Sequence, residues 1–318
     1  MNKDTKIFIA GHNGMVGSSL LRILKKKGFN NLIYFNRNKV DFENQKQTIN
    51  IFKKTMPDVL LISAAKVGGI YANNEYPYEF IYKNLLIELN LIEAANICNV
   101  KKLIFLGSSC AYPKHSRQPI KENNLLSGFL EFTNRPYAIA KIAGIELCAS
   151  LNRQNKKKFL SVMPCNLYGP NDNYDLNNSH VLPALIKKID YAKKNNSKHI
   201  SVWGSGKPLR EFMHVDDLSD CIIHILNLND KKFKKLLNLN DFSLVNIGSG
   251  EEISIFNLAK KISKVLGFKG QIKLDKRYPD GTPRKILNIE SMQNFGWKSK
   301  IKLDEGIYRT YKNYLENN

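Results

Sequence analysis

The stretch KIFIAGHNGMVGSSLLRILKKK, residues 6–27, places a short apolar run, a glycine-rich turn and an amphipathic segment in immediate succession. The run at 6–10 predicts a buried strand, and the apolar spacing at 18–27 predicts a helix. Gly11, Gly14 and Gly17 form a G-x-x-G-x-x-G turn between them. Glycine lets such a turn tighten and lets the backbone approach a pyrophosphate, which the unpaired N–H groups of a helix N-terminus can bind. The stretch therefore predicts a dinucleotide-binding strand–turn–helix unit.

Apolar runs and helical patterns continue to alternate along the first half of the chain. Strands are predicted at 31–35, 58–64, 102–107 and 159–163, with another at 243–247, and long helices at 80–97 and 135–151. This alternation is typical of right-handed βαβ units and a parallel sheet covered on both faces. We predict an α/β fold of the Rossmann type, a doubly wound parallel sheet with a smaller C-terminal lobe. Residues 1–165, with return segments near 211–250, would bind the cofactor, and residues 166–318 mainly the substrate.

The composition leaves two readings of the charge. The chain has 318 residues and a formal net charge of +21, which favours either a nucleic-acid binder or a lysine-rich protein with solvated helix faces. Because the lysines are spread along the whole chain, we favour the second reading and expect neither nucleic acid nor membrane as a partner. The five cysteines form no CxxC pair, so we expect reduced thiols, a cytoplasmic protein and no metal site.

The end of the second predicted strand bears on the choice of cofactor. An acidic residue there would bind the ribose hydroxyls of NAD, but the chain reads Phe35-Asn36-Arg37-Asn38-Lys39. Arg37 suits a 2′-phosphate, so NADPH/NADP⁺ is predicted. Asp41, slightly further on, could blur this preference.

Four residues suggest carbonyl chemistry. Ser108 and Cys110 follow the strand predicted at 102–107, and continued strand geometry would put them on the same side. Tyr137 and Lys141 are spaced i, i+4 and share one face of a predicted helix. A nearby ammonium and an oxidised nicotinamide would lower the pKa of a phenol. Tyr137 is therefore the predicted general acid in a reduction, with Lys141 beside it.

Here the chain resembles the extended short-chain dehydrogenase/reductase family over nearly its whole length, and within that family the enzymes that epimerise and reduce GDP-linked 4-keto sugars. The stretches that carry the resemblance are IAGHNGMVGS at 9–18, AAKVGGI at 64–70, GSSCAYP at 107–113, PYAIAK at 136–141, NLYGPNDNY at 166–174, SHVLPALIKK at 179–188, WGSGKPLREFMHVDD at 203–217, NIGSG at 246–250 and DGTPRK at 280–285. GSSCAYP and SHVLPALIKK are far more specific than the glycine turn.

The resemblance implies a bifunctional NADPH-dependent 3,5-epimerase and 4-reductase acting on GDP-4-keto-6-deoxy-D-mannose. Cys110 and His180 would be the acid and base that invert C3 and C5, since thiol and imidazole both exchange protons near neutral pH. Ser108 and Tyr137 would hydrogen-bond the ketone oxygen as hydride reaches C4. A homodimer is also implied, with the helices at 80–97 and 135–151 as candidates for its interface.

The resemblance also implies the binding residues. The predicted substrate-binding residues are Lys188, Trp203, Arg210 and Asp280. The predicted cofactor-binding residues are Gly11, Asn13, Gly14, Met15, Val16, Gly17, Arg37, Ala64, Ala65, Lys141, Pro164, Asn166, Leu167 and His180. The chain departs from the usual pattern at Asn13, where arginine is common, and at 35–42.

Three alternatives stay open. A related GDP-sugar reductase or epimerase could take a colitose- or heptose-type substrate. An NAD-dependent nucleotide-sugar 4-epimerase or dehydratase would share the fold, although a dehydratase would need an acidic residue in place of Cys110. A non-enzymatic nucleic-acid binder on the same scaffold would not need Ser108, Tyr137 and Lys141.

Overall fold

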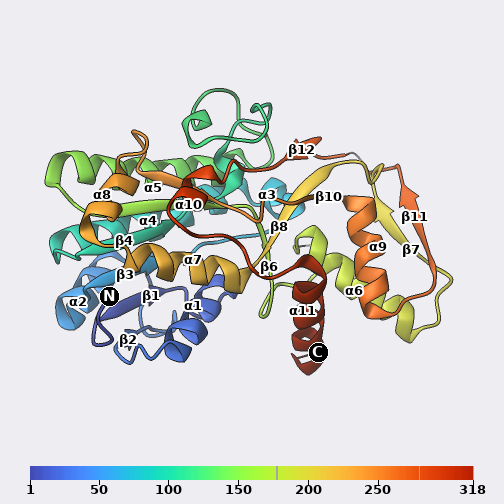
Figure 1. The fold of residues 1–318 in the computed structure, drawn as a ribbon, viewed down its shortest axis with the longest axis horizontal. Helices are drawn as coiled ribbons and strands as arrows, with labels where there is room; N and C mark the ends of the chain where they lie inside the picture. Colours follow the sequence, from blue (N-terminus) through green and yellow to red (C-terminus); the bar gives the residue numbers. More distant parts are fainter. Residues whose placement is uncertain (177, 279, 318) are drawn as a thin grey trace.

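A parallel sheet organises the N-terminal unit (Figure 1). In the computed structural model, which describes residues 1–176, 178–278 and 280–317, six parallel strands are arranged in the order β2-β1-β3-β4-β5-β9. The strands are β1 (Ile7–Ala10), β2 (Leu32–Ile33), β3 (Val59–Ile62), β4 (Lys102–Leu106), β5 (Phe159–Pro164) and β9 (Leu244–Ile247). The strand order reverses between β1 and β3, which makes the carboxyl ends of these two strands the expected ligand crevice.

Helices cover both faces of this sheet. On one face α1 (Met15–Lys26) packs against α7 (Val215–Asn227), and on the other α4 (Pro77–Ile97) packs against α2 (Gln45–Thr55) and α5 (Arg135–Asn155). Strands β1, β3 and β5 are buried at every position, as their uninterrupted apolar runs require in a sheet covered on both sides. The predicted α/β fold of the Rossmann type is confirmed.

A second, smaller unit lies beside the sheet, at the right of Figure 1, and has its own apolar core. Its helices α6 (Val181–Lys194), α9 (Ile255–Leu266) and α11 (Leu303–Asn317) enclose that core. Its strands are β6 (Asn166–Tyr168), β8 (Leu209–His214), β10 (Glu252–Ser254) and β12 (Arg284–Lys285), and the pair β7 (His199–Trp203) and β11 (Gln271–Asp275). The remaining short elements are α3 (Ile70–Glu75), α8 (Asp230–Leu237), α10 (Glu290–Asn294) and the 3₁₀ helices η1 (Ser109–Ala111) and η2 (Glu122–Asn124).

The predicted strands and long helices are all present, although several of them begin or end at other residues than predicted. Strand β2 is limited to Leu32–Ile33, shorter than the predicted 31–35. Strand β4 ends at Leu106, and the chain then turns into η1 instead of continuing as a strand. The second difference changes how the residues after β4 are oriented.

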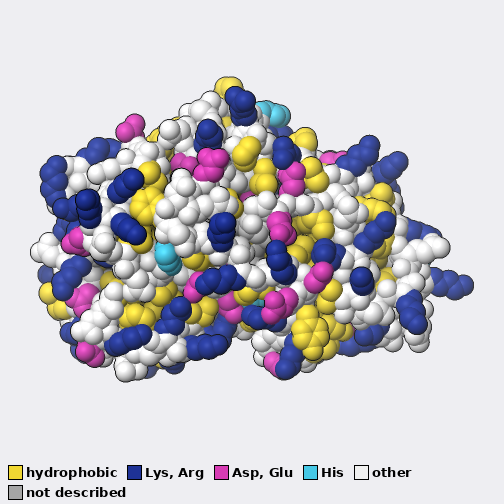
Figure 2. All heavy atoms as spheres, viewed as in Figure 1, with side chains coloured by type: hydrophobic (Ala, Val, Ile, Leu, Met, Phe, Trp, Pro, Cys, Tyr) yellow, Lys and Arg dark blue, Asp and Glu magenta, His cyan; other side chains and the backbone are white. Residues whose placement is uncertain are grey.

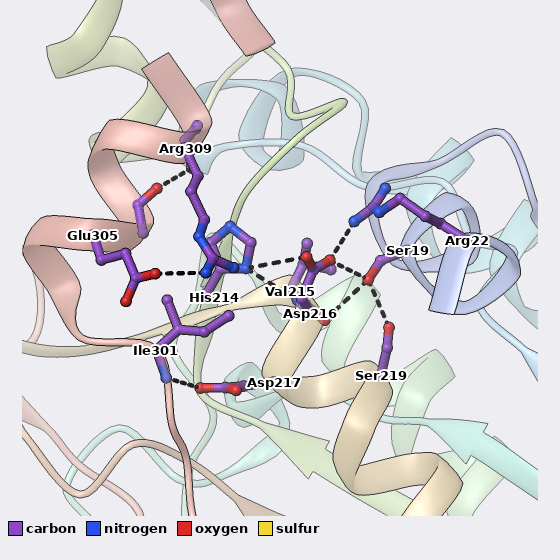
Figure 3. Close-up of polar contacts among 12 residues, drawn as sticks. Ser19, Arg22, His214, Val215, Asp216, Asp217, Ser219, Ile301, Glu305 and Arg309 are labelled. Carbon is purple, nitrogen blue, oxygen red and sulfur yellow. Dashed lines mark hydrogen bonds and ion pairs between the residues drawn. The ribbon is translucent and has the colours of Figure 1, made fainter. Parts of the chain in front are cut away.

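Polar contacts at the start of α7 join the two units (Figure 3). His214 caps α7 by accepting the backbone N–H of Asp216, and Asp216 in turn accepts a hydrogen bond from Ser19 of α1 at 2.7 Å. The carboxylate of Asp217 accepts three hydrogen bonds from the segment before α11: from the Ser299 hydroxyl at 2.6 Å and from the backbone N–H groups of residues 300 and 301 at 2.9 Å. One buried carboxylate therefore fixes the path of the chain into α11.

We expect Asp217→Ala to lower the free energy of unfolding by about 1–3 kcal/mol, because it removes a buried carboxylate that accepts three part-buried hydrogen bonds. Thermal and urea unfolding followed by circular dichroism measures the change. The matched control is Glu251→Ala, which removes an exposed ion pair with Lys302 and should cost at most about 1 kcal/mol. Equal losses in the two variants would contradict the role given to Asp217.

Candidate active site

The glycine turn after β1 is shaped by close backbone approach. Gly11 has φ +90°, and a Cβ there would lie 2.5 Å from the backbone nitrogen of Ala64, which follows β3. A Cβ on Gly17 would lie 2.1 Å from the carbonyl oxygen of Gly11. Helix α1 begins at Met15, and its N-cap, Gly14, provides no side-chain cap. The turn is thus a narrow cradle with the first-turn amides of α1 open to a ligand, which fits a dinucleotide pyrophosphate.

The other predicted nicotinamide-side residues lie at neighbouring strand ends. Ala64 and Ala65 follow β3, and Pro164 is the last residue of β5. Asn166 and Leu167 lie in β6, where the Asn166 amide donates a 2.8 Å hydrogen bond to the backbone carbonyl of Glu211. These positions share the carboxyl edge of the sheet with Gly11, as the strand order requires.

Two of the predicted cofactor-binding residues, Asn13 and Arg37, already contact other side chains of the protein. Asn13 donates to the side chain of Asn36 at 2.9 Å, in the position where arginine is common. Arg37 is largely exposed, with its guanidinium 2.5 Å from Glu43 and 3.8 Å from Asp41. The contact with Asp41 agrees with the caution drawn from the sequence, whereas Glu43 is a partner that sequence reasoning missed. Two carboxylates hold Arg37 as an exposed cation beside the crevice.

The prediction that strand geometry aligns Ser108 and Cys110 is wrong. The chain enters η1 directly after Ser108, whose hydroxyl caps it by accepting the backbone N–H of Cys110 at 3.3 Å. A 3₁₀ turn advances each residue by about 120° rather than 180°, so the alternation of a strand does not apply here, although both Ser108 and Cys110 interact with Tyr137. Ser108 also hydrogen-bonds the phenol of Tyr137. Ser108 and Tyr137 are therefore in contact, although not for the reason that the sequence suggested.

Tyr137 and Lys141 share a face of α5, as predicted. The Lys141 ammonium lies 5.8 Å from the centre of the Tyr137 ring and 4.8 Å from that of Phe105. It also forms a 2.9 Å ion pair with Glu88 of α4, and both side chains are almost fully buried. Sequence reasoning missed Glu88, and it lies in an apolar helix where one acidic residue on the inner face is the only signal.

The expected lowering of the Tyr137 pKa is not what the protein alone produces. Burial raises the pKa of Tyr137 well above its ordinary value, and the negative charges of Cys110 and Glu88 raise it further. The hydrogen bond from Ser108 opposes this shift without reversing it. Tyr137 is therefore held as a neutral phenol, which is the form that can donate a proton.

Cys110 is half-buried and lies among cationic side chains. The Lys285 ammonium is 3.9 Å from its sulfur, and the Arg210 guanidinium is close enough to interact electrostatically with the thiolate. Burial lowers the pKa of Arg210, and Cys110 and Asp280 oppose that shift. The sequence placed Lys285 in the DGTPRK stretch but gave it no role, because its approach to Cys110 depends on the pairing of β12 with β8.

His180 is the N-cap of α6. Desolvation lowers its pKa, although the residue stays open to solvent. Both observations fit a ring set in a concave surface, surrounded by protein on several sides and open on one. The imidazole is therefore neutral at neutral pH and accessible to a ligand.

The four predicted substrate-binding residues form a group of two pairs, Lys188 with Trp203 and Arg210 with Asp280. Lys188 lies 4.6 Å from the centre of the Trp203 ring, and Tyr278 stacks on Trp203 at 4.2 Å. Asp280 accepts hydrogen bonds from the backbone N–H and hydroxyl of Ser205 at 2.8 and 2.6 Å. Arg210 links this group to Cys110, since it interacts with both Cys110 and Asp280. Tyr278 is a further residue that the sequence did not single out, and it covers part of the aromatic surface expected for a base or sugar.

Four of the five cysteines lie outside this region. Cys98, Cys148, Cys165 and Cys221 are buried and unpaired, as expected of core residues. Among the described residues, no cluster of His, Cys, Asp and Glu could hold a metal ion, and no helix is both long and apolar enough to cross a membrane. Figure 2 shows Lys and Arg side chains scattered over the visible face rather than gathered in one stripe.

Comparison with known proteins gives full-length matches. A family model described as the NAD dependent epimerase/dehydratase family matches residues 7–240. The chain is 47% identical over 313 residues to the GDP-L-fucose synthase of Escherichia coli K12, covering 98% of this chain and 97% of that protein. It is also 47% identical to the putative GDP-L-fucose synthase 2 of Arabidopsis thaliana, covering 100% of this chain and 94% of that protein.

Solved structures agree with these relatives. A GDP-mannoheptose C4 reductase from Campylobacter jejuni with NADP bound superimposes with a TM-score of 0.90 at 35% identity, covering 99% of both chains. The family model covers most of the chain, and the likeness to both curated relatives extends over nearly all of it. The chain belongs to the NAD dependent epimerase/dehydratase family.

Proposed function

We propose that the protein is a bifunctional NADPH-dependent 3,5-epimerase and 4-reductase that converts GDP-4-keto-6-deoxy-D-mannose to GDP-L-fucose. The observation that carries the proposal is the meeting of a half-buried Tyr137, whose pKa is raised by desolvation, with Ser108, and of Cys110 with two cations, at one edge of the sheet. Full-length identity of 47% to a GDP-L-fucose synthase supports the same assignment.

Epimerisation is proposed to use Cys110 and His180. The C4 ketone acidifies the protons on C3 and C5, so a base can remove one and an acid can return a proton to the opposite face. Lys285 and Arg210 stabilise negative charge beside Cys110, both on its thiolate and on an enolate oxygen. His180 is neutral and accessible, as a group that exchanges protons must be.

Reduction is proposed to use Ser108, Tyr137 and Lys141. NADPH, when bound, supplies the hydride that converts the C4 carbonyl to an alcohol. Tyr137 donates its phenolic proton to O4, and Ser108 orients that oxygen by a second hydrogen bond. Lys141 holds the ribose hydroxyls of the cofactor. The neutral state of Tyr137 in the structure suits this direction of reaction, because reduction consumes a proton.

The remaining predicted residues are proposed to bind ligands. Arg210 and Lys188 carry the charge that suits a diphosphate, Trp203 the surface for the base or sugar, and Asp280 the acceptor for hydroxyls. Residues 1–165 and 211–250 bind NADP through the sheet edge, and residues 166–318 mainly bind the GDP-sugar, a division supported by the second apolar core. The five unpaired cysteines favour a reducing compartment such as the cytoplasm.

A homodimer through α4 and α5 is part of the proposal. These helices pack together and leave large apolar side chains exposed, among them Tyr82 and Leu89 on α4 and Ile139 on α5. Light scattering after size-exclusion chromatography should give twice the chain mass of 36.4 kDa, because a second copy would cover this surface. A monomer at micromolar concentration would contradict it.

A heptose-type 4-keto reductase is the second candidate. The Campylobacter jejuni reductase shares 35% identity over nearly the whole chain, so the scaffold serves more than one GDP-sugar. The two candidates differ in whether protons at C3 and C5 are exchanged as well as C4 reduced.

The deciding experiment incubates the protein with GDP-4-keto-6-deoxy-D-mannose and NADPH in deuterium oxide. We expect NADPH oxidation at 340 nm and a product with deuterium at both C3 and C5 by NMR, because each inversion takes its proton from solvent. Reduction without deuterium at either carbon would favour a simple reductase. Neither turnover nor exchange would refute the proposal.

The cofactor preference should depend on Arg37. We expect Arg37→Ser to raise the NADPH KM at least tenfold while changing the NADH KM little, because only NADPH carries the 2′-phosphate that the guanidinium would meet. The control is Lys39→Ser, which removes a nearby positive charge without the proposed contact. Equal effects of the two substitutions would indicate a general electrostatic contribution instead.

A further inference from the structure

Glu88 is a buried carboxylate with no role in the chemistry described so far. It lies on the inner side of α4, where its side chain is 1% exposed, and its Oε1 is 2.9 Å from the Lys141 ammonium, which is 3% exposed. Its second oxygen, Oε2, is also buried and has no hydrogen-bond partner in the described part of the chain. Such a group costs stability, and a buried acceptor left unsatisfied calls for an explanation other than packing.

A glycine on the neighbouring helix leaves the space that this carboxylate occupies. Gly144 of α5 faces it, and a Cβ at that position would lie 2.9 Å from Oε2 and 2.5 Å from the Phe105 ring. Glycine therefore lets α5 approach both α4 and β4 closely enough to bring Lys141 and Glu88 together. The ammonium is enclosed by a carboxylate and by the rings of Phe105 and Tyr137.

The groups around Glu88 come from two elements. Helix α5 provides Lys141, Tyr137 and Cys148, and β4 provides the Phe105 ring. Burial raises the pKa of Glu88, and the Lys141 ammonium opposes that rise. The charge of Glu88 in turn favours the protonated forms of its neighbours.

We propose that Glu88 is a positioning residue that keeps Lys141 as an ammonium and Tyr137 as a phenol, so that the active site stays ready to donate a proton to the reduced carbonyl. The inference rests on the proposed function, since it assigns a reason for the protonation state that reduction needs. Lys141 alone would favour a tyrosinate, the form suited to oxidising an alcohol. Glu88 offsets that charge, and the buried pair is neutral as a unit.

The pH dependence of reduction should reveal this role. In Glu88→Gln the carboxylate charge is lost while the side-chain shape is kept, so Tyr137 loses its proton at lower pH. An opposite charge within about 4–6 Å shifts a pKa by about 1–3 units. We therefore expect the alkaline limb of kcat/KM for reduction to move at least about one pH unit toward acid. Deuterium exchange at C3 and C5, which depends on Cys110 and His180, should keep its rate within about threefold.

The matched control is Glu146→Gln. Glu146 is also acidic and pairs with Arg153 on the same helix α5, but that pair is half exposed and begins more than two helical turns after Tyr137. Its pH profile should match that of the wild type. Glu88→Asp keeps the charge but draws it back by one methylene, and should give a limb between those of the wild type and Glu88→Gln.

A second readout does not need the sugar. NADPH binding is followed by cofactor fluorescence as the pH is raised from 7 to 10. The loss of binding should begin at a lower pH in Glu88→Gln than in Glu146→Gln, because the Lys141 ammonium that holds the ribose has lost its counter-charge. If the binding titration shifts in Glu88→Gln but the wild type does not reduce the sugar, the proposed function is refuted, whereas the role of Glu88 is retained. A folded Glu88→Gln protein with wild-type pH limits in both assays would overturn the inference. If Glu88→Gln does not fold, a folded Glu88→Asp protein with the wild-type pH limits in both assays would overturn the inference instead.

Discussion

The parallel sheet is the constraint on which the rest of the structure depends. Parallel strands need a crossover after each strand, so the loops that leave their carboxyl ends all meet at one edge. Because the strand order reverses between β1 and β3, Gly11 and Ala64 approach there to within a distance that only glycine permits. The same edge receives Ser108 after β4 and Asn166 after β5. Residues far apart in the chain thus meet at one edge because of the strand order.

Above this edge the structure separates two kinds of proton chemistry by their electrostatic surroundings. Tyr137 lies in a buried setting where negative charge and desolvation keep its proton in place. Cys110 lies next to the positively charged side chains of Lys285 and Arg210. In the function proposed above, Tyr137 gives up its proton to the developing alkoxide, and Cys110 exchanges protons with carbon. This separation is the physical basis for proposing two reactions at a single ketone.

Much of this arrangement was predictable from the sequence, because strand periodicity, glycine spacing and the Tyr–Lys pair are local signals. The strand count, the long helices and the position of Tyr137 on α5 followed from them. Sequence reasoning failed where the answer depends on tertiary contact. The turn into η1 reorients Cys110, and Glu88, Lys285 and Tyr278 meet the site only through helix packing, the pairing of β12 with β8 and ring stacking. The burial that raises the Tyr137 pKa in the protein alone is not visible in an i, i+4 spacing.

The central claim is that proton donation to oxygen and proton exchange at carbon belong to different residues. Tyr137→Phe removes only the phenolic hydroxyl, and the measurement is NMR of GDP-4-keto-6-deoxy-D-mannose incubated with this variant and NADPH in deuterium oxide. The account predicts that reduction falls by about 10²-fold or more, as expected for loss of a general acid, while deuterium still enters at C3 and C5 at nearly the wild-type rate. Loss of both reactions together, in a variant with unchanged folding and NADPH binding, would contradict it.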